Sequence, residues 1–221
     1  MALAVRFRSV VALLGRFPVL AGVDLDVAEG EVVLLRGANG AGKTSLLRAC
    51  AGLVPVASGE ASVLGHDLRR DRRSVRRRVG LLGHDGFLYD DLTAAENVRF
   101  AARAGGGDGA GATVALERVG LGSRLQDVPV GRLSAGQRRR VSVAAVAVRR
   151  PSLWLLDEPH AGLDSDGRQL VDHLVRDAVA AGATVVYASH EGDQALGLAG
   201  RVVTLAGGRV QASARESVHV A

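Results

Sequence analysis

The chain has 221 residues, of which 48% are apolar and 23% charged, and these are the proportions of a folded domain with a sizeable core. Its one cysteine, Cys50, excludes an internal disulfide and favours a reducing compartment. The net charge is +5, and Lys43 is the one lysine among 28 basic residues. Such arginine enrichment fits compositional drift better than a nucleic-acid surface, because basic charge alone reports only non-specific attraction. We therefore expect no nucleic-acid partner.

The N-terminal segment is not expected to be a secretory signal or a membrane anchor. Residues 1–17 are largely apolar, but Arg6, Arg8 and Arg16 interrupt them and leave no signal-peptide core. No other stretch approaches the ~20 consecutive apolar residues of a spanning helix. These features predict a cytoplasmic protein that reaches a membrane only through a partner.

Apolar runs predict buried strands of a parallel sheet, and hence an α/β fold. The segment 23–37 opens with alternating apolar and polar residues, typical of a strand with one solvated face. It continues into the unbroken apolar run Val32 to Leu35, typical of a strand covered on both faces. Comparable runs lie at 152–157 and 183–189. Helical patterning between such runs is the rhythm of a parallel sheet.

The last third of the chain also carries helix and hairpin signals. Residues 165–182 place apolar side chains at helical spacing and end at Gly182, which predicts a C-terminal cap. Residues 202–212 predict a hairpin that turns at Gly207 and Gly208.

The middle of the chain, residues 86–150, contains no run that predicts a buried strand. Thr93 and Glu96 have capping-box spacing, and Ser134 in "LSAGQRRR" can cap a second helix. We expect a single domain, 1–221, with an α/β core formed by 1–85 and 151–221 and a helical subdomain at 86–150.

A phosphate-binding loop follows the first buried strand and opens a helix. The sequence "GANGAGKTS" has the spacing G-x-x-x-x-G-K-T of a P-loop. Its glycines let successive backbone N–H groups point at phosphate, Lys43 can reach the β- and γ-phosphates, and the Thr44 hydroxyl can bind Mg²⁺. The predicted nucleotide-binding residues are Gly37, Ala38, Asn39, Gly40, Ala41, Gly42, Lys43, Thr44 and Ser45.

Two carboxylates end the strand in "SLWLLDEP". Asp157 is placed to hold the metal, and Glu158 to act as the general base that polarises the attacking water. Taken alone, such a pair could instead cap a helix. His190 follows another buried strand, where a γ-phosphate contact is favoured over a structural role.

The order of these motifs resembles that of the ATP-binding cassette (ABC) ATPases over nearly the whole chain. The resemblance implies a P-loop NTPase fold with a small antiparallel β subdomain and an inserted helical subdomain. It implies that the signature loop, Ser134, Ala135, Gly136 and Gln137, binds the γ-phosphate held by the P-loop of a second subunit. It further implies two ATP molecules with Mg²⁺ in a head-to-tail homodimer, and Asp164 at the dimer contact.

Two positions depart from the family pattern. His84 stands where the family usually has a glutamine, and an imidazole titrates near ~6.5. We therefore expect the coupling of hydrolysis to depend on pH. The family also stacks adenine on an aromatic residue just before a glycine, but Leu14 precedes Gly15, so this platform is either missing or supplied by Phe17.

A closer resemblance is to the ATPase subunits of haem exporters in cytochrome c maturation. It rests on "GHDGFLYDDLTAAENVRF", "LSAGQRRRV" and "LWLLDEP", with Gly83-His84 as its most specific feature. The resemblance implies an ATPase on the inner face of the cell membrane, bound to an integral membrane permease. A soluble single-cassette ATPase of an assembly pathway is the alternative. A small-molecule kinase is disfavoured because it would not use "LSAGQ".

Overall fold

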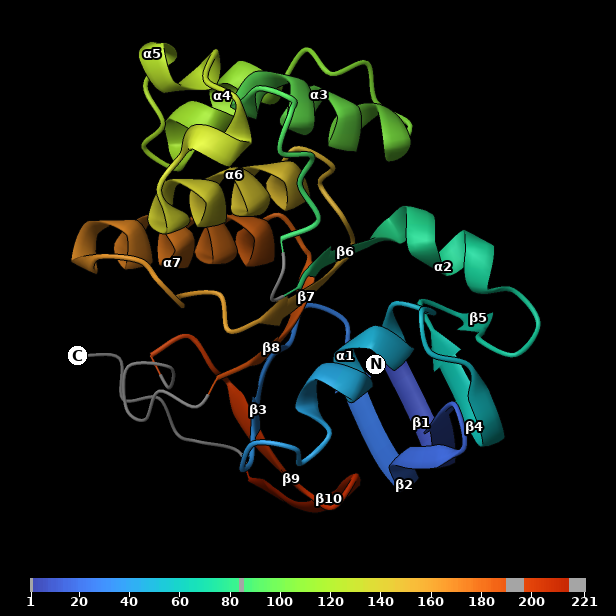
Figure 1. Cartoon of the computed structure of the whole chain (residues 1–221). Helices are drawn as coiled ribbons and strands as arrows, with labels where there is room; N and C mark the ends of the chain where they lie inside the picture. Colours follow the sequence, from blue (N-terminus) through green and yellow to red (C-terminus); the bar gives the residue numbers. More distant parts are fainter. Residues whose placement is uncertain (1, 84–85, 190–196, 215–221) are drawn as a thin grey trace.

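The computed structural model describes residues 2–83, 86–189 and 197–214, which form two sheets and a group of helices (Figure 1). The larger sheet has six strands, in the spatial order β10 (Arg209–Ala214), β9 (Arg201–Ala206), β3 (Val32–Arg36), β8 (Thr184–Ala188), β7 (Leu153–Asp157) and β6 (Val79–Leu82). All neighbours pair in parallel except β10, which is antiparallel to β9. The predicted parallel sheet of an α/β fold is confirmed.

The register of the larger sheet aligns the carboxyl ends of its strands. Leu35 of β3 pairs with Ala188 of β8, and Ala188 pairs with Asp157 of β7. On the far side of β7, Leu156 pairs with Leu82 of β6. Segments that follow these strands therefore emerge side by side at one edge of the sheet, which is where an open α/β sheet binds its ligands.

The smaller sheet is antiparallel, with the strand order β2 (Phe17–Ala28), β1 (Leu3–Leu14), β4 (Val56–Val63) and β5 (His66–Asp67). Burial alternates along the second half of β2, as its sequence predicts. Helix α1 (Lys43–Cys50) packs between the two sheets, and one apolar cluster joins Phe7, Leu47 and Leu155 across them. The antiparallel subdomain implied by the family resemblance is confirmed.

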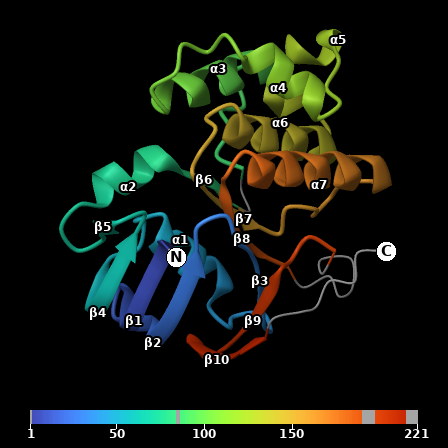
Figure 2. The same cartoon turned by 180° about the vertical axis from the view of Figure 1, so that it is seen from behind.

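The remaining helices lie on the other face of the larger sheet or beside it (Figures 1 and 2). They are α2 (Arg72–Arg78), α3 (Ala94–Ala104), α4 (Ala112–Arg118), α5 (Ser123–Gln126), the 3₁₀ turn η1 (Val130–Arg132), α6 (Ala135–Ala147) and α7 (Ser165–Ala180). Residues 86–150 form no strand, as expected. A second apolar cluster runs from these helices onto Trp154 and Tyr187 of the sheet. The helical segment thus shares its core with the sheet, and its limits as a subdomain stay a prediction.

Local signals read from the sequence are confirmed at several helix ends and turns. Thr93 and Glu96 form a reciprocal capping box at α3. Gly182 follows α7 with a φ of 90°, and Gly207 and Gly208 turn the β9–β10 hairpin with φ of 55° and 72°. Within the described ranges, no helix combines the length and the apolar character needed to cross a bilayer.

Candidate active site

The P-loop lies between β3 and α1 and is packed so closely that two of its glycines leave little or no room for a side chain. A Cβ on Gly37, whose φ is 152°, would lie 2.4 Å from the carbonyl oxygen of Leu205. A Cβ on Gly42, whose φ is 105°, would lie 3.1 Å from the carbonyl oxygen of Val19. These contacts fix the backbone path that directs the loop's N–H groups toward phosphate.

The turn of the β9–β10 hairpin is hydrogen-bonded to the P-loop. Gly208 donates its N–H to the carbonyl of Ala41 at 3.0 Å, and its carbonyl accepts the N–H of Ala21 from β2 at 2.8 Å. The P-loop is therefore held by the turn of the β9–β10 hairpin, and β2 in turn holds that turn in place. Sequence reasoning predicted this hairpin but not its support of the P-loop, because nothing in the local pattern reports that contact.

Lys43 is the charged group of the loop. Its side chain is buried, and its Nζ donates to the carbonyl oxygens of Gly37 at 2.6 Å and Ala38 at 3.2 Å. The ammonium thus lies inside the loop, and its predicted contact with the β- and γ-phosphates stays a prediction. Ala38, Asn39 and Gly40 are exposed at the tip of the loop or close to it, whereas Ser45 is half-buried in the first turn of α1.

Thr44 and Asp157 meet at the carboxyl edge of the sheet. The Thr44 hydroxyl donates to Asp157 Oδ2 at 2.7 Å, and Asp157 is only 5% exposed. Hydroxyl and carboxylate oxygens are the hard ligands that Mg²⁺ prefers. This pair fits the metal that the sequence assigned to it.

Glu158 follows Asp157 with a backbone conformation that a non-glycine residue rarely adopts. Its φ is 48°, in the left-handed region, which costs about 1 kcal/mol or more and recurs at functional sites. Its N–H donates to the carbonyl of Ala188 at 2.9 Å, so the neighbouring strand β8 holds the main chain in place. The turn places two consecutive carboxylates at the same edge as the P-loop.

The signature loop and the "AGLD" segment form a second surface. Ser134 and Gln137 make a reciprocal capping box at the start of α6, and a Cβ on Gly136 would lie 3.1 Å from the carbonyl oxygen of Gly162. Together with Asp164 these residues line a cavity of about 370 Å³. Ala135 lies in the first turn of α6.

Asp164 caps α7 and is paired with α6. Its Oδ1 accepts the N–H of Gly167 at 2.8 Å and a hydrogen bond from Arg140 Nη2 at 2.6 Å. The hydrogen bond from Gly167, assisted by Arg140, lowers the pKa of the carboxyl group. Asp164 is therefore ionised on the surface that also carries the signature loop.

The P-loop and the signature loop are far apart within one chain. The P-loop lies beside the two sheets, whereas the signature loop begins α6 in the helical layer, and the two views agree on this separation (Figures 1 and 2). One chain therefore does not bring them onto one nucleotide.

His84 and His190 lie outside the described residues, so their predicted roles stay predictions. The residues before them, Gly83 and Ser189, follow β6 and β8 at the edge of the sheet that carries Asp157. Ser189 donates its N–H to the carbonyl of Leu35 at 3.4 Å.

One buried side chain at this edge was missed by sequence reasoning. Arg139 of α6 is 8% exposed, and its guanidinium donates to the carbonyl oxygens of Gly83, Asp157 and Glu158. Burial lowers the pKa of this guanidinium, and the charges of Asp157 and Glu158 oppose that shift. The sequence feature that could have pointed to Arg139 is the run of three arginines directly after the signature loop.

Comparison with known proteins decides the family. The family model described as ABC transporter matches residues 20–161, more than half of the chain. The chain belongs to the ABC transporter family. As an ABC ATPase, it binds and hydrolyses ATP.

Among curated ABC proteins, the chain is 42% identical over 172 residues to the cytochrome c biogenesis ATP-binding export protein CcmA of Bordetella bronchiseptica, covering 77% of this chain and 76% of the relative. It is 38% identical over 200 residues to CcmA of Bradyrhizobium diazoefficiens, covering 90% and 96%. Among solved structures, it resembles a dimeric post-hydrolysis state of the ATP-binding cassette MJ0796 bound to ADP and Pi. The TM-score is 0.88 at 25% identity, with 96% of this chain and 98% of that chain covered.

The packing of the P-loop of this ABC ATPase predicts a difference between two glycine substitutions. Gly37→Ala should raise the Kd for ATP roughly 10-fold or more, because the new methyl group must displace the loop from Leu205 and misdirect N–H groups that bind charged oxygens. Gly40→Ala is the matched control, since Gly40 also has a positive φ, 79°, but a methyl group there would meet no atom within 4 Å. Equilibrium titration with a fluorescent ATP analogue checks this. Equal effects of the two substitutions would contradict the steric account.

Proposed function

We propose that this chain is the ATPase subunit of a haem exporter that serves cytochrome c biogenesis. It works as a homodimer around two ATP molecules, on the cytoplasmic face of the membrane, and drives an integral membrane permease. The observation that carries the catalytic part is the hydrogen bond from Thr44 to Asp157, since it joins the P-loop to the strand end that bears Glu158.

In this proposal, Lys43 and the N–H groups of the P-loop bind the β- and γ-phosphates. Thr44 and Asp157 hold Mg²⁺, which when bound neutralises charge on the phosphate oxygens. The Glu158 carboxylate orients a water molecule and accepts its proton as the water attacks the γ-phosphorus, and ADP is the leaving group. His190 contacts the γ-phosphate.

The separation of the two loops supports the proposed dimer. The helix N-terminus at Ser134 presents free N–H groups and a positive dipole end to an anion, but the P-loop of the same chain is remote from it. A second copy placed head-to-tail brings its P-loop to this end of α6, with Asp164 at the contact. Two equivalent sites form because each chain carries both loops.

The permease is proposed to bind an apolar groove between the sheet and the helices. The groove has a volume of about 360 Å³, and its lining includes Leu53, Phe87, Ala101 and Val146. Leu53 is 47% and Phe87 60% exposed. Phe87 also has a φ of 51°, and an exposed aromatic residue in a strained conformation is typical of a binding surface.

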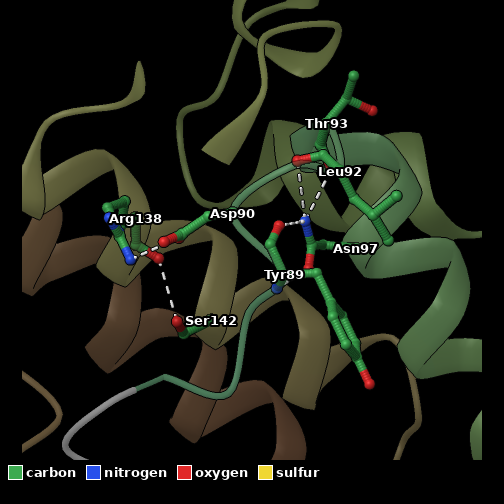
Figure 3. Close-up of polar contacts among 7 residues, drawn as sticks. All are labelled: Tyr89, Asp90, Leu92, Thr93, Asn97, Arg138 and Ser142. Carbon is green, nitrogen blue, oxygen red and sulfur yellow. Dashed lines mark hydrogen bonds and ion pairs between the residues drawn. The ribbon is translucent and has the colours of Figure 1, made fainter. Parts of the chain in front are cut away.

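Hydrogen bonds with the Asn97 side chain hold the backbone of residues 89–93 beside this groove. Asn97 of α3 accepts the N–H of Tyr89 at 2.8 Å and donates to the carbonyls of Tyr89, Leu92 and Thr93 at 3.0 to 3.1 Å (Figure 3). Tyr89 is 54% exposed, and its ring meets that of Phe100 edge to face at 5.2 Å. Phe87 at the groove and Tyr89 beside it thus present a pre-formed apolar surface, suited to an apolar element of a membrane protein.

Haem export is supported by the relatives named for cytochrome c biogenesis and by the Gly83-His84 pair. A soluble assembly ATPase is the second candidate, but it gives no reason for the exposed apolar groove. Phe17 is 78% exposed at the tip of the β1–β2 hairpin opposite Leu14, and it is the aromatic residue at this tip that can stack on adenine.

Replacing the proposed base tests the catalytic assignment. Glu158→Gln should bind ATP with unchanged affinity but lower kcat roughly 100-fold or more, because the amide cannot accept the proton of the attacking water. It should also accumulate as an ATP-bound dimer, which sedimentation velocity detects. Glu117→Gln is the control, since Glu117 is exposed on α4 and should retain activity. A Glu158→Gln protein that hydrolyses ATP normally would remove the assignment.

Purification from membranes tests the permease. The tagged protein, solubilised gently from its native cells, should co-purify with a multi-spanning membrane protein and with haem-handling companions. The double substitution Phe87→Asp with Tyr89→Ser should abolish this association and leave the ATPase activity of the isolated subunit intact. Val114→Asp is the matched control, because Val114 is 58% exposed on α4 and does not line the groove. Retention of soluble partners alone would favour the assembly-pathway candidate.

A further inference from the structure

Arg139 lies where the signature helix meets the catalytic edge of the sheet. It is two residues beyond Gln137, on the turn of α6 that faces the ends of β6 and β7. Its Nη1 donates to the carbonyl of Gly83 at 2.8 Å, and its Nη2 donates to the carbonyls of Asp157 at 2.6 Å and Glu158 at 2.5 Å. One guanidinium therefore ties together three segments that are distant in sequence.

These contacts are not explained by stability alone. The side chain is 8% exposed, and among the described residues its Nε has no hydrogen-bond partner. Burying a cation is costly, and apolar or neutral side chains of similar volume often serve stability as well or better. The guanidinium directs its other hydrogen bonds to main-chain carbonyls at the site of hydrolysis. That placement points to a role in the reaction.

The Glu158 main chain is the part of the site that most needs such support. Its left-handed conformation, with φ of 48°, is held at the N–H by Ala188 of β8 and at the carbonyl by Arg139 of α6. The main chain fixes where the Glu158 side chain begins and so limits the positions that its carboxylate can reach. A shift of the reacting groups by about 1 Å can cost 100-fold in rate.

We propose that Arg139 is a positioning residue for hydrolysis. It fixes the Glu158 main chain and couples it to α6, the helix that begins at the signature loop. It also couples the Glu158 main chain to Gly83, which precedes in sequence the segment proposed to contact the permease. A displacement of α6 relative to the sheet then moves the main chain of Glu158 through the hydrogen bond from Arg139. The inference rests on the proposed role of Glu158 as general base. None of the three carbonyls belongs to the P-loop, and the contact with Asp157 is to its main chain and not to the carboxylate that would hold Mg²⁺, so ATP affinity should depend on Arg139 only weakly.

The test separates kcat from ATP binding. In the isolated subunit, Arg139→Gln should lower kcat roughly 10- to 100-fold and leave the Kd for ATP within about 3-fold, which is under about 0.7 kcal/mol. The kcat of Arg139→Lys should lie between those of the wild type and Arg139→Gln, because a single ammonium group cannot replace the two separately directed Nη donors of the guanidinium. ATP affinity is measured by equilibrium titration and kcat by phosphate release.

Arg138→Gln is the matched control. Arg138 precedes Arg139 on the same helix and has the same charge, but it is half-exposed and pairs with Asp90 at 2.8 Å (Figure 3). It should keep the kcat of the wild type. Thermal melting of each variant shows that the folded protein is being compared, and Arg139→Lys serves if Arg139→Gln does not fold.

Two results would overturn the inference: an unchanged kcat in folded Arg139 variants, or a fall in kcat matched by an equal loss of ATP affinity. Failure of the proposed function gives a different pattern. If Glu158→Gln remained active, the base assignment would fail whatever Arg139 does. If Glu158→Gln were inactive and the Arg139 variants fully active, only the positioning role would be lost.

Discussion

The active site depends on one constraint, the parallel register of the larger sheet. Because Leu35, Ala188 and Asp157 share one row across β3, β8 and β7, the segments that leave these strands emerge together. The hydrogen bond from Thr44 to Asp157 then joins residues 113 positions apart in the chain. The turn at the proposed base Glu158 and the buried guanidinium of Arg139 lie at this same edge.

The same architecture gives a physical reason for both a P-loop and a signature loop in one small protein. A P-loop at the sheet edge and a helix N-terminus in the helical layer each supply N–H groups for an anion, but they face different surfaces. In the proposed homodimer each nucleotide is held by both kinds of loop. Hydrolysis in one site then changes the contact between subunits, and the groove beside Phe87 is placed to transmit that change to a permease.

The parts that the sequence predicted are those with local patterns. The P-loop, the capping boxes at Thr93 and Ser134, the buried strands and the Gly207-Gly208 turn each depend on neighbouring residues. The missed parts depend on contacts between distant segments. The hydrogen bond from Gly208 to Ala41 and those from Arg139 to three carbonyls produce no periodic pattern in the sequence. An arginine beside two others is typical of surface charge, and only the fold shows that this one is buried.

The central claim, that each nucleotide is shared between two chains, is tested by mixing two defective variants in a Glu158→Gln background. Lys43→Ala removes the P-loop ammonium. Ser134→Asp keeps the cap of α6 but sets a negative charge against phosphate. With Mg²⁺ and ATP, sedimentation velocity should show monomers for each variant alone and dimers for the equimolar mixture, because only the mixture pairs an intact P-loop with an intact signature loop. A mixture that stays monomeric, beside a Glu158→Gln control that dimerises, would contradict the account.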